Sequence, residues 1–144
     1  MKTNEFTQQL DDGRIAEEIR QVEQTTSGEI RVFISKQSSE DPMADARREF
    51  HRLQMQATSL RNAVLLYFAP ASNRFAVFGD EGIHLRCGPE FWAAITQEME
   101  TFLRAGAFNE AIFAGVRRTG VELTRHFPKH AVDRDDLPNA VVRD

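Results

Sequence analysis

The sequence predicts an α/β protein, a three-layer α/β/α sandwich around a small mixed sheet. Three observations predict this fold class. Apolar residues recur at helical spacing in four segments, and three other segments are short and rich in β-branched and aromatic residues. The order of these segments along the chain is α-β-α-β-β-α-α. Helices and strands in this order place helices on both faces of a sheet.

The first two elements are a helix and a strand. A helix is expected over 11–24, where apolar residues recur every three or four positions and aspartates stand at the start. A strand is expected over 29–35, in which Ile30, Val32 and Ile34 share one face.

A helix and a pair of strands follow. The helix is expected over 42–56, with Pro42 in its first turn. Residues 62–69 show no alternation, which is typical of a central strand covered on both faces. Residues 70–73 form a turn of hairpin length, so the strand expected over 74–79 should pair antiparallel with 62–69.

Two helices complete the expected fold. The first covers 89–104 and is ended by Gly106, and the second covers 108–126 and cannot continue through Pro128. The chain of 144 residues is long enough for one domain with a sizeable core. We therefore expect a single α/β domain over 1–128 and a charged tail over 129–144.

Composition and charge exclude several classes of function. The net charge of −4 and the lack of a basic stripe argue against a nucleic-acid partner. The longest apolar run, residues 63–71, is too short to cross a bilayer, so no membrane insertion is expected. The N-terminal residues have no apolar signal core, and the single cysteine, Cys87, forms no intramolecular disulfide. These features together indicate a cytoplasmic protein.

The expected topology brings three polar segments to one edge of the sheet. The first two strands are joined by a helix and should be parallel, whereas the third strand runs back along the second. The end of the third strand therefore lies where the first two strands begin. The segments that meet there are TSGE (26–29), LRN (60–62) and GDEGIH (79–84).

This polar edge is the candidate site. Glu29, Arg61, Asn62 and Asp80 are the candidate ligand-binding residues, and Asp80 is the best catalytic candidate. Asp80, Glu81 and Asn62 offer hard oxygen ligands that suit calcium or magnesium, whereas Arg61 could hold a phosphate or carboxylate. The structural alternative is an ion pair of Arg61 with Asp80 or Glu29 at a sheet edge.

Two nearby residues have weaker claims to chemistry. His84 lies four residues after Asp80, which would allow an acid–base pair, but a partly exposed histidine at a helix start also explains it. Cys87 lacks an evident base partner and is interpreted as a small, half-buried residue.

At these residues the chain resembles the TPM domain family. The core of the family is similar to TSGEIRVFIS (26–35), LRNAVLLYFAP (60–70) and RFAVFGDEGIH (74–84). The C-terminal half resembles the family at Trp92, at 102–108, at Gly115 and Gly120, at HFP (126–128) and at DLPN (136–139). The resemblance covers nearly the whole chain in order.

The resemblance implies an α/β/α sandwich and a small bacterial protein of cytoplasmic type. The family includes thylakoid lumen proteins linked to photosystem repair and a receptor-modulating membrane protein of animals, and acid phosphatase activity and calcium binding are associated with some members. Thylakoid-type members carry Asp-Asn-Gly where this chain has Arg61, Asn62 and Ala63. They show Gly-Tyr-Gly-Leu-Glu where this chain has residues 79–83. One carboxylate is thus replaced by a guanidinium, and another appears nearby.

Three functions follow as expectations. The first is a binding or interaction module that takes a metal ion or a small phosphate at the polar edge. The second is a phosphomonoesterase assisted by calcium or magnesium, which rests on the resemblance alone and would need a carboxylate-held water to attack phosphorus. The third is a structural partner of a membrane or stress complex, which an exposed apolar patch would favour.

Overall fold

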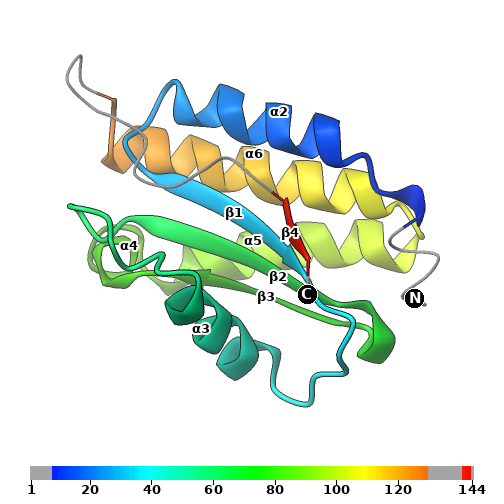
Figure 1. Ribbon diagram of the computed structural model, residues 1–144. Helices are drawn as coiled ribbons and strands as arrows, with labels where there is room; N and C mark the ends of the chain where they lie inside the picture. The colour runs from blue at the N-terminus through cyan, green and yellow to red at the C-terminus, as the bar shows by residue number, and fades with distance from the viewer. Residues whose placement is uncertain (1–7, 130–140, 144) are drawn as a thin grey trace.

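The computed structural model describes residues 8–129 and 141–143, and it contains the predicted helices and strands in the predicted order together with two further elements (Figure 1). In chain order they are α2 (Asp12–Glu23), β1 (Glu29–Ile34), α3 (Pro42–Arg52), β2 (Ala63–Ala69), the 3-10 turn η1 (Pro70–Ser72), β3 (Arg74–Gly79), α4 (Glu81–Cys87), α5 (Pro89–Arg104), α6 (Phe108–His126) and β4 (Val141–Arg143). None of the helices in these ranges combines the length and apolar character needed to cross a membrane.

The sheet is mixed and lies between two layers of helices, as the sequence predicts. Its strand order is β3-β2-β1-β4. Strand β1 runs parallel to β2 and to β4, whereas β2 and β3 are antiparallel. Helices α2, α5 and α6 cover one face and α3 covers the other (Figure 1).

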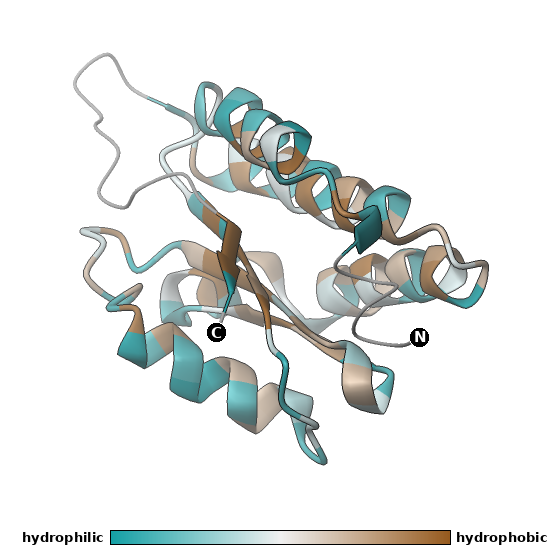
Figure 2. Ribbon diagram, turned by 45° about the vertical axis from the view of Figure 1, so that its right-hand side comes forward, coloured by the Kyte–Doolittle hydropathy of each residue, from teal (hydrophilic) through white to brown (hydrophobic). Residues whose placement is uncertain are grey.

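Each face of the sheet has its own apolar core. Ile30, Val32 and Ile34 point to the α2–α5–α6 layer, whereas Phe33 points to the α3 side and stacks on Tyr67 with ring centroids 5.7 Å apart. In Figure 2 the apolar residues accordingly concentrate in the strands and in the helix surfaces turned toward them. The two central strands are therefore buried on both sides.

The helix expected over 42–56 ends earlier, at Arg52. Its start is fixed by Asp41, whose side chain accepts a hydrogen bond from Ala44 N–H at 3.1 Å. Its end follows from Gln54, which adopts a left-handed backbone with φ of 58°. This turn places Met55 in the core with 1% exposure, so burial of Met55 replaces the last helical turn.

The structure contains two elements, α4 and β4, that were not expected from the sequence. The short helix α4 follows β3 directly, because Asp80 caps it as soon as the strand ends. Residues 141–143, expected in the tail, instead form β4, in which Val141 pairs with Val32 and Arg143 contacts Asp12 at 2.6 Å. Residues 130–140 of the expected tail lie outside the described residues.

Candidate functional site

The three polar segments meet at one edge of the sheet, as the topology predicts. Asn62 Nδ2 donates to Ser27 Oγ at 3.3 Å, and Glu29 N–H donates to Asn62 O at 3.4 Å. Gly82 N–H, at the start of α4, donates to Arg61 O at 2.9 Å. The beginnings of β1 and β2 and the end of β3 are thus tied together at this polar edge.

Arg61 and Asp80 form a two-pronged ion pair at the polar edge. Arg61 Nε lies 2.7 Å from Asp80 Oδ2, and Arg61 Nη2 lies 2.9 Å from Asp80 Oδ1. Asp80 Oδ1 also accepts from Glu81 N–H at 2.8 Å and so caps α4. The hydrogen bonds to Asp80 raise the pKa of Arg61 above its ordinary value. Both oxygens of the best catalytic candidate are therefore engaged.

The backbone holds this pair in place. Arg61 has a left-handed backbone with φ of 51°, which an arginine adopts at a cost. The first turn of α4 lies directly on this segment, since a Cβ added at Gly82 would stand 2.6 Å from Arg61 O and closer still to Leu60 O. A glycine is required there because two backbones touch.

Glu29 lies in a different ion-pair group. Its Oε2 stands 3.7 Å from Arg31 Nη2, and Arg31 Nη1 donates to Glu23 Oε2 at 2.8 Å. All three side chains are nearly fully buried. Of the two pairings weighed for Arg61, the structure shows the one with Asp80, while Glu29 pairs with Arg31, which joins β1 to Glu23 at the end of α2.

The carboxylates of the polar edge form no group typical of a metal centre. Across residues 8–129 and 141–143, no three histidine, cysteine, aspartate or glutamate side chains gather where they could hold one ion. Glu81 is 69% exposed and reaches Arg61 Nη1 at 3.7 Å. Arg61 thus occupies the space beside both carboxylates, where a cation would have to stand.

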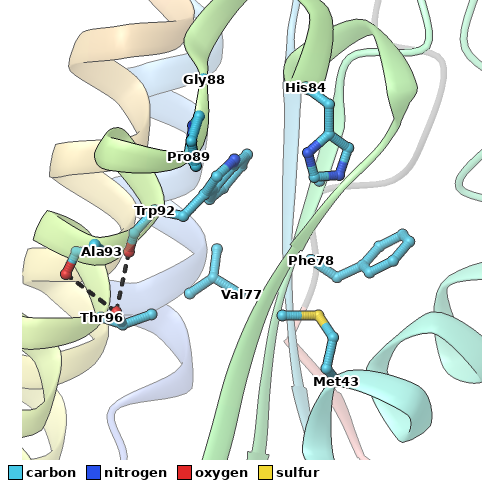
Figure 3. A pocket seen from close by; sticks show the side chains of 10 residues that line it. Met43, Val77, Phe78, His84, Gly88, Pro89, Trp92, Ala93 and Thr96 are labelled. Atoms are coloured by element: carbon cyan, nitrogen blue, oxygen red, sulfur yellow. Dashed lines mark hydrogen bonds between the residues drawn. The ribbon is translucent and has the colours of Figure 1, made fainter.

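A second candidate site lies along the outer edge of β3. It is a hollow of about 730 Å³ between that strand, the first half of α5, the start of α3 and the second half of α4. Figure 3 shows Val77 and Trp92 on one side of the strand and Phe78 and Met43 on the other. We call this hollow the β3 pocket; its lining residues are Met43, Val77, Phe78, Gly79, His84, Gly88, Pro89, Trp92, Ala93 and Thr96.

The β3 pocket is apolar, and His84 is its single titratable lining residue among those described. Trp92 lies against the strand, because a Cβ added at Gly79 would stand 2.6 Å from the indole ring. The His84 imidazole faces the same indole, with ring centroids 5.9 Å apart. His84 therefore lines the pocket from α4. The Asp80 carboxylate pairs with Arg61 and not with the His84 imidazole.

Sequence reasoning missed the β3 pocket. Trp92 shares a helical face with Ile95, Met99 and Phe102, so it is interpreted as core. Ile95 and Met99 are indeed fully buried, whereas Trp92 is half-buried beside the strand. One signal was available, since an antiparallel strand that follows a parallel pair and precedes a helix tends to lie at a sheet edge.

Comparison with known proteins agrees with this fold. The model of the TPM domain matches residues 3–121. The chain is similar to the NMR structure of the BA42 protein from the psychrophilic bacterium Bizionia argentinensis, with a TM-score of 0.86, 34% sequence identity and 92% of each chain covered. No curated protein matches the chain. The family match and the structural likeness together show that the chain belongs to the TPM domain family.

Proposed function

We propose that the protein is a binding module that takes an uncharged, apolar ligand or protein segment in the β3 pocket. The observation that carries this proposal is the lining of that pocket. Its volume of about 730 Å³ lies within the usual range for ligand sites, and its walls are apolar apart from His84 and Thr96. Met43 and Ala93, at the rim, are exposed. A ligand that removes this surface from water would gain hydrophobic stabilisation.

The geometry of the polar edge favours a structural role there. A cation at Asp80 would have to displace the Arg61 guanidinium, and an anion at Arg61 would meet the carboxylates of Asp80 and Glu81. Either ligand would have to break a bidentate charge-assisted pair. Binding at the β3 pocket requires no such loss.

The single tryptophan allows a direct test, because Trp92 lines the proposed pocket. The probe is Nile red, an uncharged dye that becomes fluorescent in apolar surroundings. We expect Nile red to bind and to quench Trp92 emission by energy transfer. Ala93→Glu, which places a carboxylate at the rim, should abolish the signal. Gln97→Glu adds the same charge one turn along α5, outside the pocket, and should leave it intact. Equal binding by both variants, or no binding by the unmodified protein, would refute the proposal.

A metal-assisted phosphomonoesterase is the second candidate. The observation in its favour is that Asp80 and Glu81 both approach one guanidinium, with Asn62 next to it in the chain. If Arg61 swung outward, these oxygens could hold calcium or magnesium. The test is turnover of p-nitrophenyl phosphate with either ion, in the unmodified protein and in Asp80→Ala. Activity that Asp80→Ala retains would belong to a contaminant, and activity that it loses would support this candidate.

A further inference from the structure

We propose that the occupant of the β3 pocket is an extended peptide segment that adds to the sheet as a strand beside β3. This inference rests on the proposed function, because it names the class of ligand that the same pocket takes. It is carried by the backbone of β3, by the walls on either side of the strand and by a second hollow along the same edge.

The backbone of β3 offers a free row of hydrogen-bonding groups. Asp80 N–H donates to Ala63 O at 3.0 Å, which makes these two residues a hydrogen-bonded pair. Hydrogen-bonded and non-hydrogen-bonded pairs alternate along an antiparallel ladder. By the observed register, Phe75, Val77 and Gly79 take the non-hydrogen-bonded positions. Their N–H and C=O groups therefore point away from β2, toward the pocket side.

No strand of the described chain uses this row, because β3 ends the sheet order and has β2 as its one neighbour there. An added strand would present matching groups at every second residue, a spacing of about 6.7 Å. A compact small molecule could fill the apolar volume but could not pair with three successive groups. The row therefore favours a peptide backbone.

The walls of the pocket fit the alternating side chains of a strand. Val77 faces the α5 side, and Phe78 faces the α3 side (Figure 3). A strand added beside them would point successive side chains to the same two sides. One set would meet Trp92, Ala93 and Thr96, and the other would meet Phe78 and Met43. This is the usual division in strand addition, where the main chain supplies affinity and the side-chain pockets supply specificity.

A second hollow continues along the same edge toward the start of β3. It has a volume of about 350 Å³ and is lined by Asn73, Phe75, Glu100, Leu103 and Arg104. Glu100 and Arg104 pair with each other at 2.7 Å across its wall. The occupant should therefore carry apolar side chains near Gly79 and polar side chains near Asn73.

A second copy of the chain fits this edge less well than a peptide. In a symmetric pairing of two β3 edges, α5 and the start of α3 of one copy would face the same helices of the other, since both flank the strand. A peptide brings no helices with it. The proposal therefore commits to a bare strand, and self-association becomes an outcome of the test.

The experiment selects peptides from a library of short random sequences on the purified full-length chain. A selected peptide is then synthesised with free amides and with alternate amides N-methylated. N-methylation keeps the side chains but removes strand donors. We expect alternating apolar sequences that bind the unmodified protein but not Ala93→Glu. We also expect binding to weaken about tenfold or more on N-methylation of the paired positions.

The outcomes separate this inference from the proposed function. Equal affinity of the methylated and unmethylated peptides overturns strand addition, and so does a library that yields no binder while Nile red still binds. Failure of Nile red as well overturns both proposals. A third outcome is that no peptide is selected and sedimentation shows a dimer that Ala93→Glu dissociates. The occupant would then be a second copy of the chain, and the inference would be overturned.

Discussion

At the scale of single residues, Arg61 and Asp80 decide how the polar edge is understood. The Arg61 guanidinium makes two hydrogen bonds to the Asp80 carboxylate. Asp80 is 5% exposed, so its charge requires a partner. The pair links the start of β2 to the start of α4. This structural link is sufficient to explain the ion pair without any ligand.

The two functions of Asp80, capping α4 and pairing with Arg61, can be separated by substitution. Asp80→Ala removes both, and loss of a helix cap alone costs about 0.5–2 kcal/mol. Asp80→Asn retains an oxygen that can accept from Glu81 N–H but removes the charge. We expect the free energy of unfolding in urea to be highest for the wild type, lower for Asp80→Asn and lowest for Asp80→Ala. An unchanged value in Asp80→Ala would show that the pair does not hold α4.

Gly82 and Gly13 provide a matched pair of glycine substitutions. A methyl group at Gly82 meets the backbone oxygens of residues 60 and 61, so Gly82→Ala should destabilise the fold by about 1–3 kcal/mol, as overpacking does. At Gly13, within α2, the nearest atom is Asp11 Oδ1 at 3.7 Å. Gly13→Ala should therefore stabilise by about 0.5–1 kcal/mol. Thermal unfolding of both variants measures the contrast, and a shift of the same sign in both would contradict it.

At the scale of elements, the packing of α2 on α6 includes an ion pair that depends on pH. Arg117 Nε and Nη2 donate to the two oxygens of Glu18 at 3.0 and 2.6 Å. These hydrogen bonds lower the pKa of Glu18 below its ordinary value of 4.5. The pair joins helices that are far apart in the sequence.

The sign of the pH effect follows from the lowered pKa of Glu18. The unfolded chain binds the proton more readily, so the contribution of Glu18 to stability is fully present above the unfolded pKa and is lost as the pH falls through the folded pKa. Between about pH 5 and pH 3, the free energy of unfolding should fall more steeply in the wild type than in Glu18→Gln. Arg117→Gln should show the same shallower dependence. Parallel curves for all three proteins would exclude this contribution.

The elements also show what the sequence could predict. The helices over 12–23, 89–104 and 108–126 carry strong apolar periodicity together with start and stop residues, so they were predicted closely. Helix α3 was predicted too long, because burial of Met55 overrides a pattern that continues past Arg52. Strand β4 was missed because three residues in a charged tail carry no periodicity, and their pairing with β1 is a tertiary effect.

The candidate sites show the same division. The meeting of Ser27, Asn62 and Gly82 followed from topology, because strand directions fix which ends lie together. Topology did not predict that Arg61 pairs with Asp80 and not with Glu29. That pairing depends on the left-handed backbone of Arg61 and on the buried Arg31, which pairs with Glu29. Predicting the β3 pocket would have required knowing that β3 lies at the side of the sheet and how far α5 lies from it.

At the scale of the whole molecule, the two outermost strands of the sheet differ in length. Strand β4, beside β1, has three residues, whereas β3, beside β2, has six, and each has one neighbour in the sheet among the described residues. The unpaired backbone groups of an exposed outermost strand can pair with another chain, and proteins usually cover or shorten such strands. Here α5 and the start of α3 flank β3 and form an apolar pocket beside it. We therefore expect binding beside β3, and a structural ion pair at the polar edge, where the ends of the strands meet.

Amide hydrogen exchange of β3, measured by NMR with and without a selected peptide, shows whether a strand adds at the free side of β3. In the free protein, the amides of Phe75, Val77 and Gly79 should exchange fast, whereas those of Ala76 and Phe78 should be protected by β2. Peptide binding should slow Phe75, Val77 and Gly79 and leave Arg61 and Glu81, at the polar edge, unchanged. Slowing at the polar edge, with no change in these three β3 amides, would place the binding site at the polar edge and refute binding beside β3.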